Sequence, residues 1–340
     1  MFDLKECKNL FGDLEPAPPE MDREALANKI HSQLSGITLE TLVPLLTTEF
    51  RESIEYVGLV RGEPRCSKTS LLYNPHRLTT RHSLTGKSML DNLQDPRFAD
   101  GLARAALWTR DLNLRDHLYR LLEMGISGSP RVDEFRPNKV RQIALTFDVT
   151  KSSRVLDPCA GWGGRLLGFS TVTDSYTAFD PSTRTMAGLQ RMAREFIAPF
   201  RPDFSASLTC LPFEDADLPS DHFDFALTSP PYFDTERYAD GESTNSHNRY
   251  ASFEDWVEGF YEPFLVKTMT ALKPDATFVC NIGSRRWPLD EELLRICSER
   301  GYLVGRLEKY NRVSLADNQI KKSGKEKKEG ETFYTIKKGK

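Results

Sequence analysis

Beyond about residue 131, short apolar runs alternate with segments of helical spacing. The runs, which we expect to be strands, are Ser153–Asp157, Tyr176–Phe179, Ser207–Leu211, Phe223–Thr228, Thr277–Asn281, Leu303–Tyr310 and Phe333–Lys337. The segments expected to be helices are Phe135–Phe147, a segment from Arg165, Leu189–Phe200, Phe253–Leu272 and Asp290–Arg300. Such alternation predicts an α/β fold with a doubly wound sheet and helices on both faces. Ligands of these sheets bind at the carboxyl ends of the strands.

The first 130 residues lack this alternation and have helical spacing in several places. A break rich in glycine and serine at Gly125–Pro130 then separates them from the rest of the chain. We therefore expect a mostly helical N-terminal region over residues 1–130 and a second domain over residues 131–340. The helical segments expected in the N-terminal region are Asp22–Leu34, Leu39–Phe50 and Phe98–Leu122.

The composition of the 340 residues excludes several classes of protein. No apolar stretch approaches the roughly 20 residues of a membrane span. The first residues, MFDLKE, lack a basic segment followed by an apolar one, so we expect a cytoplasmic protein without a secretory leader. The 6 cysteines are scattered without a CxxC pair, which favours reduced thiols over a zinc site or a disulfide framework.

The net charge of −3 hides a strong asymmetry along the chain. Residues 1–60 hold 5 Lys and Arg against 11 Asp and Glu, whereas residues 61–131 hold 12 against 7 and residues 306–340 hold 11 against 5. Association with a polyanion depends on such local excess rather than on the total. Solvated surface charge without a nucleic-acid partner is an equally good interpretation of any single segment.

A glycine-rich turn follows the first strand expected in the second domain. Glycines at a strand-to-helix turn let the backbone approach a ligand closely, and the start of a helix offers unpaired N–H groups. Asp180 stands at the tip of the next strand, about 20 residues on, where nucleotide-binding folds hold a ribose diol. A turn without a ligand and a helix cap at Asp180 are the alternatives. The candidate cofactor-binding residues of these two segments are Asp157, Pro158, Cys159, Ala160, Gly161, Gly163 and Asp180.

The tetrapeptide Ser229-Pro230-Pro231-Tyr232 ends the apolar run Phe223–Thr228. Prolines cannot donate to a sheet ladder, so they end the strand and stiffen the backbone just beyond it. A hydroxyl, free carbonyl oxygens and an aromatic face then stand together at one strand terminus. A planar amino group lying on Tyr232 has hydrogen-bond acceptors there, which predicts a site for the exocyclic amine of a nucleobase. The alternative for Tyr232 is a core aromatic.

With both motifs present, residues 131–340 resemble the S-adenosylmethionine-dependent amino-methyltransferases of DNA, which act on cytosine N4 or adenine N6. Asp157–Gly164 matches the cofactor loop of that family, Asp180 its ribose-binding acid and Ser229–Tyr232 its (Ser/Asn/Asp)-Pro-Pro-(Tyr/Phe) catalytic motif. Phe135, followed by Arg-Pro and a helix, resembles the preceding cofactor motif more weakly. The resemblance implies a Rossmann-like methyltransferase sheet with S-adenosylmethionine as cofactor.

The resemblance also implies the chemistry. The lone pair of the exocyclic amine is delocalised into its ring, and acceptors at the Ser229 side chain and the Pro230 carbonyl would favour a pyramidal nitrogen. The base must leave the duplex to be reached, with Tyr232 and Phe233 as candidates to stack on it. Alignment of the reactants then supplies most of the catalysis without a metal. Ser at the first motif position leans toward cytosine N4, although the acceptors suit either amine.

Two further segments are candidates for the same site. Glu214 and Asp215 follow the strand Ser207–Leu211, where the family often holds the adenine of the cofactor. Either acid would accept a hydrogen bond from its amino group, and a plain loop is an equally good interpretation. The long polar loop Asp234–Arg249 leaves the catalytic motif, and it is either a lid over the flipped base or an exposed connection.

No separate recognition domain follows the catalytic motif, so target recognition is expected in residues 1–130. The lysine-rich insertion Asn318–Gly330 suits contacts with phosphates rather than with bases. The resemblance implies DNA as the partner, with RNA on the same fold as the second choice. A non-catalytic nucleic-acid-binding module and a protein glutamine methyltransferase are further alternatives. The sequence leaves open the target sequence, the oligomeric state and any restriction partner.

Overall fold

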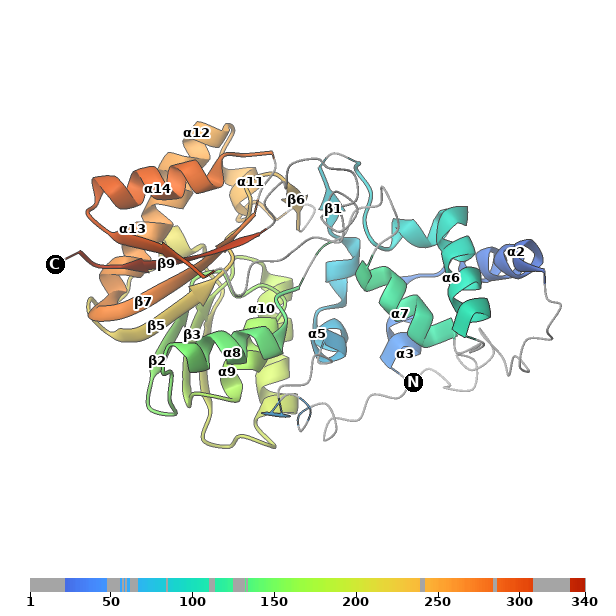
Figure 1. The fold of residues 1–340 in the computed structure, drawn as a ribbon, viewed down its shortest axis with the longest axis horizontal. Coiled ribbons are helices and arrows are strands. Elements are labelled where there is room, and N and C mark those ends of the chain that lie inside the picture. The colour runs from blue at the N-terminus through green and yellow to red at the C-terminus, as the bar shows by residue number, and fades with distance from the viewer. Residues whose placement is uncertain are drawn as a thin grey trace. The chain divides into compact units, whose positions relative to one another are not determined.

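A computed structural model gives the fold (Figure 1). It describes residues 22–47, 56, 58, 60–61, 67–83, 85–109, 114–124, 132, 134–238, 242–283, 286–307 and 331–339. The chain forms two compact units. The first comprises Met1–Val57, Arg65–Glu134 and Glu236–Tyr238, and the second comprises Gly58–Pro64, Phe135–Thr235 and Ala239–Lys340.

The second unit is built on a seven-stranded sheet with the order β4-β3-β2-β5-β7-β9-β8. Numbered within this sheet, the order is 3-2-1-4-5-7-6, which follows the Rossmann order through its fifth strand. The strands β4, β3, β2, β5 and β7 are parallel, and β9 runs antiparallel to both β7 and β8. The strands are β2 (Arg154–Asp157), β3 (Ser175–Phe179), β4 (Ser205–Thr209), β5 (Phe223–Thr228), β7 (Leu272–Ile282), β8 (Leu303–Arg306) and β9 (Thr332–Lys337).

Helices cover both faces of this sheet. Figure 1 shows α8, α9 and α10 along one face and α12, α13 and α14 along the other. The expected doubly wound, Rossmann-like α/β fold with a mostly helical N-terminal region is confirmed. The helices of this unit are α8 (Pro137–Thr146), α9 (Gly164–Ser170), α10 (Thr183–Met192), α11 (Ser246–Arg249), α12 (Phe253–Trp256), α13 (Glu262–Ala271) and α14 (Leu289–Glu299), with the short turns η4 (Ala193–Ile197), η5 (Phe213–Asp215) and η6 (Val257–Tyr261).

The sheet has a hydrophobic core on each face, and the alternating side chains of the central strand β5 contribute to both. Phe225 packs with Phe147, at a ring distance of 5.5 Å, and with Phe169 of α9 at 6.2 Å. Its neighbour Ala226 belongs to the other core, which α12, α13 and α14 form with β7 and β9. Because successive side chains of a strand point to opposite faces, an apolar strand such as β5 is buried on both sides.

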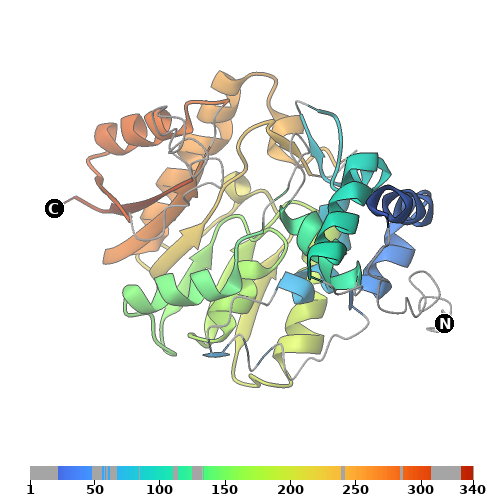
Figure 2. The ribbon, with the colours of Figure 1, turned by 45° about the vertical axis from the view of Figure 1, so that its right-hand side comes forward.

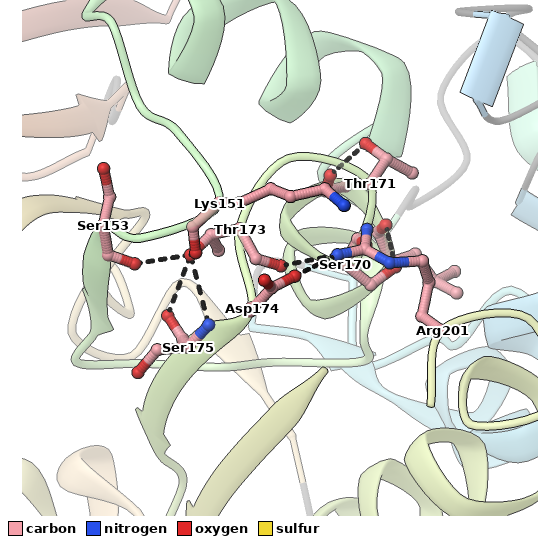
Figure 3. A network of polar contacts seen from close by, with 10 residues as sticks. Lys151, Ser153, Ser170, Thr171, Thr173, Asp174, Ser175 and Arg201 are labelled. Carbon is pink, nitrogen blue, oxygen red and sulfur yellow. Dashed lines mark hydrogen bonds and ion pairs between the residues drawn. The ribbon is translucent and has the colours of Figure 1, made fainter. Parts of the chain in front are cut away.

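A polar network joins the amino ends of β2 and β3, opposite their carboxyl ends (Figure 3). The buried Thr173 donates from its hydroxyl to the Ser153 carbonyl and accepts from the Ser175 amide at 3.1 Å. Arg201 donates to the Ser170 and Thr173 carbonyls and pairs with the Asp174 carboxylate. These contacts fix where β2 and β3 begin, and so where their carboxyl ends lie.

The described part of the first unit is mainly helical. Arg23 of α2 pairs with Asp100 of α6 through two hydrogen bonds of 2.7 Å, and Figure 2 shows α2 lying beside α6. A two-stranded ribbon joins β1 to β6 in antiparallel register, with Arg81 opposite Arg237. The elements are α2 (Arg23–Leu34), α3 (Leu39–Thr47), α5 (Ser67–Tyr73), η2 (Pro75–Thr79), β1 (Arg81–His82), η3 (Asp91–Gln94), α6 (Pro96–Thr109), α7 (Leu114–Met124) and β6 (Glu236–Arg237).

This ribbon makes the division of the chain different from a single cut at residue 130. β6 follows the tetrapeptide Ser229–Tyr232 by only a few residues, yet it pairs with β1 and belongs to the first unit. The two units therefore differ from residues 1–130 and 131–340 by this excursion and by Gly58–Pro64, which belongs to the second unit. The segments Gly125–Pro130, residues 48–50, residues 308–310 and the insertion Asn318–Gly330 lie outside the described residues.

Several elements differ from their expected limits. The segment expected as one helix at Phe253–Leu272 contains the π-helical turn η6 between α12 and α13, and β7 begins at Leu272. The strand expected at Ser207–Leu211 is β4, shifted to Ser205–Thr209. Strand ends depend on pairing with neighbours, which local apolar patterning does not report. Within the described part of the chain, no helix has both the length and the apolar character needed to cross a membrane.

Candidate functional site

Four loops leave the sheet at one edge, the carboxyl ends of β2, β3, β4 and β5. The parallel register pairs Asp157 with Ala178 and Phe179 with Thr209, which aligns the ends of the first three strands. From β2 the chain continues to β3 and β4 on one side of the sheet, and it then returns to β5 on the other side of β2. The strand order therefore reverses between the neighbouring strands β2 and β5. Ligands of open α/β sheets bind at such a switch point. Here the glycine turn follows β2 and the tetrapeptide follows β5.

The glycine turn needs glycine at two positions. Gly161 and Gly163 have φ values of +59° and +107°, a region that residues with a side chain rarely adopt. A Cβ at Gly163 would also lie 2.7 Å from the Met192 side chain of α10. Between β2 and these glycines, Pro158 and Ala160 are buried, and the Ala160 amide donates to the Phe179 carbonyl at 2.7 Å.

Asp180 binds the turn through its side chain. Its carboxylate accepts hydrogen bonds of 3.0 Å from the amides of Gly161 and Ser182, one on each oxygen. Removal from water raises the pKa of Asp180 to about 7, against the lowering effect of these two amide donors. Each oxygen of a carboxylate accepts more than one hydrogen bond. The carboxylate therefore keeps acceptor capacity for a diol.

Asp157 is the centre of a buried network and is fully enclosed. Its Oδ2 accepts from Arg165 Nε and the Tyr176 hydroxyl, each at 2.7 Å. Its Oδ1 accepts from the Thr228 hydroxyl at 2.7 Å and the Cys159 amide at 3.3 Å. These four donors use the acceptor capacity of the carboxylate. The side chain thus joins the loop after β2 to the end of β5, and any role of Asp157 in ligand binding passes through the loop shape that it maintains.

Phe135 lies against the same network. The guanidinium of Arg165 sits 5.4 Å from the centre of the Phe135 ring, and it also donates to the Cys159 carbonyl in the glycine turn. A cation over an aromatic face is an attractive contact. Phe135 also packs edge to face with Phe333 of β9 at 5.8 Å. The structure thus brings the weakly matched Phe135 motif and the glycine turn together.

Glu214 and Asp215 form a charged cluster with Arg249 of α11. Arg249 lies 2.9 Å from Glu214 Oε1 and 2.8 Å from Asp215 Oδ2, and its second terminal nitrogen donates to Asp215 Oδ1 at 3.3 Å. The Glu214 side chain is 5% exposed and that of Asp215 is 47% exposed. Burial raises the pKa of Glu214, with Arg249 acting in the opposite direction. Lys267 of α13 holds the backbone of the same turn through the Glu214 and Ala216 carbonyls.

The tetrapeptide forms a compact turn directly after β5. The Ser229 and Tyr232 hydroxyls lie 3.2 Å apart, and the Tyr232 hydroxyl is 3.5 Å from the Asn281 carbonyl on β7. Pro230 is buried, whereas Ser229, Pro231 and Tyr232 are partly exposed. Ser229 and Tyr232 are therefore within reach of a ligand at this edge of the sheet.

Phe233 is a core residue rather than a surface for stacking. It has φ +52° and is 7% exposed, with its ring among Phe253, Trp256 and Trp287 at 5.1–6.0 Å. A left-handed conformation is unfavourable for a bulky residue, and packing of the ring in this aromatic cluster holds it there. The expectation that Phe233 stacks on a base is therefore wrong.

The candidate residues thus gather at one edge of the second unit, in the loops after β2, β3, β4 and β5 and before α8. Sequence reasoning did not select Tyr176, Thr228 or Arg249, all of which bind candidate acids. The position of Thr228 directly before the tetrapeptide is a local signal that could have marked it as a candidate residue. Tyr176 and Arg249 carry no local signal, since their partners lie in other loops. Among the described residues, no group of three or more His, Cys, Asp or Glu is arranged to hold a metal ion.

Comparisons with known proteins agree with the general fold only. No protein-family model and no curated protein matches the chain. Similar solved structures include the tRNA (m1A58) methyltransferase TrmI of Aquifex aeolicus, at 14% identity over 62% of this chain and 72% of that chain with a TM-score of 0.39. A SAM-dependent O-methyltransferase of Thermotoga maritima has 12% identity over 62% and 68%, with a TM-score of 0.40. An rRNA methylase of Streptococcus thermophilus has 11% identity over 62% and 100%, with a TM-score of 0.37. Structural similarity at such low sequence identity and TM-score carries no information on substrate, cofactor or site.

Proposed function

We propose that this protein is an S-adenosylmethionine-dependent methyltransferase that acts on the exocyclic amino group of a flipped-out base in DNA, cytosine N4 or adenine N6. The observation that supports it most is the position of Ser229–Tyr232. This tetrapeptide follows β5, the glycine turn follows β2, and the two strands meet at the switch point of the sheet. The Thr228–Asp157 hydrogen bond joins the two loops.

The residues present fit the cofactor. The Asp180 carboxylate is held by two backbone amides and has acceptor capacity left for a ribose diol. Gly161 and Gly163 both adopt a positive φ, which gives the turn a backbone shape that residues with a side chain rarely adopt. Phe135 and the acids Glu214 and Asp215 border the same edge. When bound, S-adenosylmethionine supplies an electrophilic methyl group.

The remaining roles belong to side chains of this chain. The Ser229 hydroxyl and the Pro230 carbonyl accept hydrogen bonds from the two N–H groups of the target amine and orient its lone pair. The ring of Tyr232 supports the base, and its hydroxyl lies beside that of Ser229. Orientation of this kind is worth several orders of magnitude in rate when the reacting atoms are aligned. The proton that the amine loses passes to solvent.

The test is incubation of the full-length protein with tritiated-methyl S-adenosylmethionine and unmethylated duplex DNA, followed by nucleoside analysis. Labelled N4-methyldeoxycytidine or N6-methyldeoxyadenosine supports the proposal and identifies the base. Label in total RNA and none in DNA would replace DNA with RNA as the substrate. Cofactor binding without label in either polymer would rule out both nucleic-acid substrates in isolated form.

A further inference from the structure

The segment Glu242–Tyr250 leaves the loop after the tetrapeptide and contacts the loop that follows β3. The Thr244 hydroxyl donates to the Pro181 carbonyl at 3.1 Å. The Thr183 hydroxyl donates to Glu242 Oε1 at 3.0 Å. Both partners lie within three residues of Asp180, the proposed ribose ligand. Glu242 Oε2 is buried, and no described residue donates a hydrogen bond to it.

The other end of this segment contacts the loop that follows β4. Arg249 pairs with both Glu214 and Asp215, the candidate acids for the adenine of the cofactor. The Arg249 side chain is 28% exposed, so its ion pairs are partly shielded from solvent. Removal of one partner of a charge pair in this setting costs more than it does on an open surface.

Tyr250 fixes this end a second time. Its hydroxyl lies 2.8 Å from the Gly259 carbonyl and 3.2 Å from Glu214 Oε1. A Cβ at Gly259 would lie 2.2 Å from the Tyr250 ring, so glycine in the turn η6 permits this close packing. The segment is therefore attached at both ends, and each attachment lies on a loop proposed to bind the cofactor.

We propose that Glu242–Tyr250 is a strap across the ends of β3 and β4 that retains the cofactor, and that Arg249 is the positioning residue that closes it. Arg249 acts through Glu214 and Asp215, which it orients toward the site. The strap must open for the spent cofactor to leave, because the segment joins the two loops between which that cofactor lies. This inference rests on the proposed cofactor site and adds a step that the catalytic motif does not predict.

The test measures the dissociation rate of S-adenosylhomocysteine from the full chain by stopped-flow fluorescence. Because the strap must open before the ligand leaves, loss of one of its attachments acts mainly on the dissociation rate. We expect R249Q to release the ligand about tenfold faster, and R249K, which keeps the charge, to lie between R249Q and wild type. R295Q is the matched control, because Arg295 also pairs with two acids, Glu292 and Glu299, but on helix α14, outside the segment Glu242–Tyr250 and the loops that it contacts.

The outcomes separate this inference from the proposed function. Wild-type protein that binds neither S-adenosylmethionine nor S-adenosylhomocysteine would overturn the cofactor site and the strap together. Wild-type binding with unchanged dissociation in R249Q would overturn the strap alone. If R249Q fails to fold, R249K decides the matter, and dissociation from it at the wild-type rate would overturn the strap. Faster release in R249Q and R249K but not in R295Q supports it, provided that circular dichroism shows all variants folded.

Discussion

Single residues divide the proposed site into a part that holds the cofactor and a part that orients the target. Asp180 lies with the glycine turn, through its bond to the Gly161 amide. Ser229 lies with Tyr232 on the loop after β5. Because the two groups contact different partners, their substitution should affect different kinetic constants.

We expect S229A to lower turnover roughly ten- to a hundredfold, with cofactor affinity nearly unchanged, because one acceptor for the target amine is removed. D180A should instead weaken cofactor binding by a similar factor. Calorimetric titration with S-adenosylhomocysteine and steady-state kinetics on DNA separate the two effects. A similar loss of cofactor affinity in both variants would contradict this division of roles.

Tyr232 is expected to act mainly through its ring. Y232A should therefore lower turnover more than Y232F, since the phenylalanine retains the aromatic face. The hydroxyl lies 3.2 Å from that of Ser229, so Y232F also tests whether this contact orients the serine. Steady-state turnover of both variants is the measurement. An equal loss of turnover in the two variants would assign the role of Tyr232 to its hydroxyl rather than to its ring.

Asp180 should make cofactor binding depend on pH. Its pKa is raised to about 7, and only the ionised carboxylate accepts hydrogen bonds at both oxygens from a diol and the amides together. Affinity for S-adenosylhomocysteine should fall as the pH falls below about 7, and the difference from D180N isolates this group. A pH profile in D180N identical to that of wild type would assign the dependence elsewhere.

The same pKa shift has a consequence for folding. The folded protein retains a proton on Asp180 up to about pH 7, whereas an unfolded aspartate loses it near its ordinary pKa of 3.8. The contribution of Asp180 to stability is therefore greatest below pH 4 and is lost as the pH rises through 7. Burial of this acid costs stability at neutral pH, which is the expected condition of a carboxylate kept for a ligand.

Among the secondary-structure elements, β2, β3, α9 and β5 meet at Asp157. Each contributes a donor or the acid itself, so the network sets the spacing between the glycine turn and the tetrapeptide. A buried carboxylate with all its donors in place keeps its neighbours in one geometry. Loss of one donor leaves a buried charge that is poorly satisfied.

T228V, which replaces a hydroxyl with a methyl group, should lower the free energy of unfolding by about 1–3 kcal/mol. T270V is a matched control, because among the described residues the Thr270 hydroxyl bonds to Val266 of its own helix, at an exposed position, and it should change stability by less than about 0.5 kcal/mol. Chemical denaturation of both variants is the measurement. Equal stability of T228V and T270V would show that the network tolerates the loss of this donor.

For the molecule as a whole, the charge distribution predicts how a nucleic acid binds. Lysines concentrated in the insertion Asn318–Gly330 should contact phosphates, although this segment lies outside the described residues. Lysines that contact phosphates raise affinity without reading sequence. We propose that target recognition falls to residues 1–130, and the unit that contains them also contains β6.

Replacing Lys321, Lys322, Lys325, Lys327 and Lys328 with glutamine should weaken DNA binding at low salt. It should also reduce the slope of log affinity against log salt by about 0.9 for each phosphate that the variant no longer neutralises. Turnover at saturating DNA should be unaffected. Fluorescence anisotropy over a salt series measures the slope, and an unchanged slope would show that the insertion lies away from the nucleic acid.

The sheet and the two motifs were predictable because their signals are local. The alternation of strands and helices, the glycine turn and the proline-ended strand each lie within a few consecutive residues, and the carboxyl ends of parallel strands necessarily share an edge.

Tertiary contacts determined the other features of the site and of the two units. Thr228 bonds to Asp157 71 residues earlier, and Arg249 bonds to Asp215 34 residues earlier. β6 pairs with β1 within the first unit, although the residues on both sides of β6 belong to the second unit, and Phe233 turns into the core instead of the site. Such pairings arise from packing of distant segments, which hydrophobic period and turn chemistry do not encode.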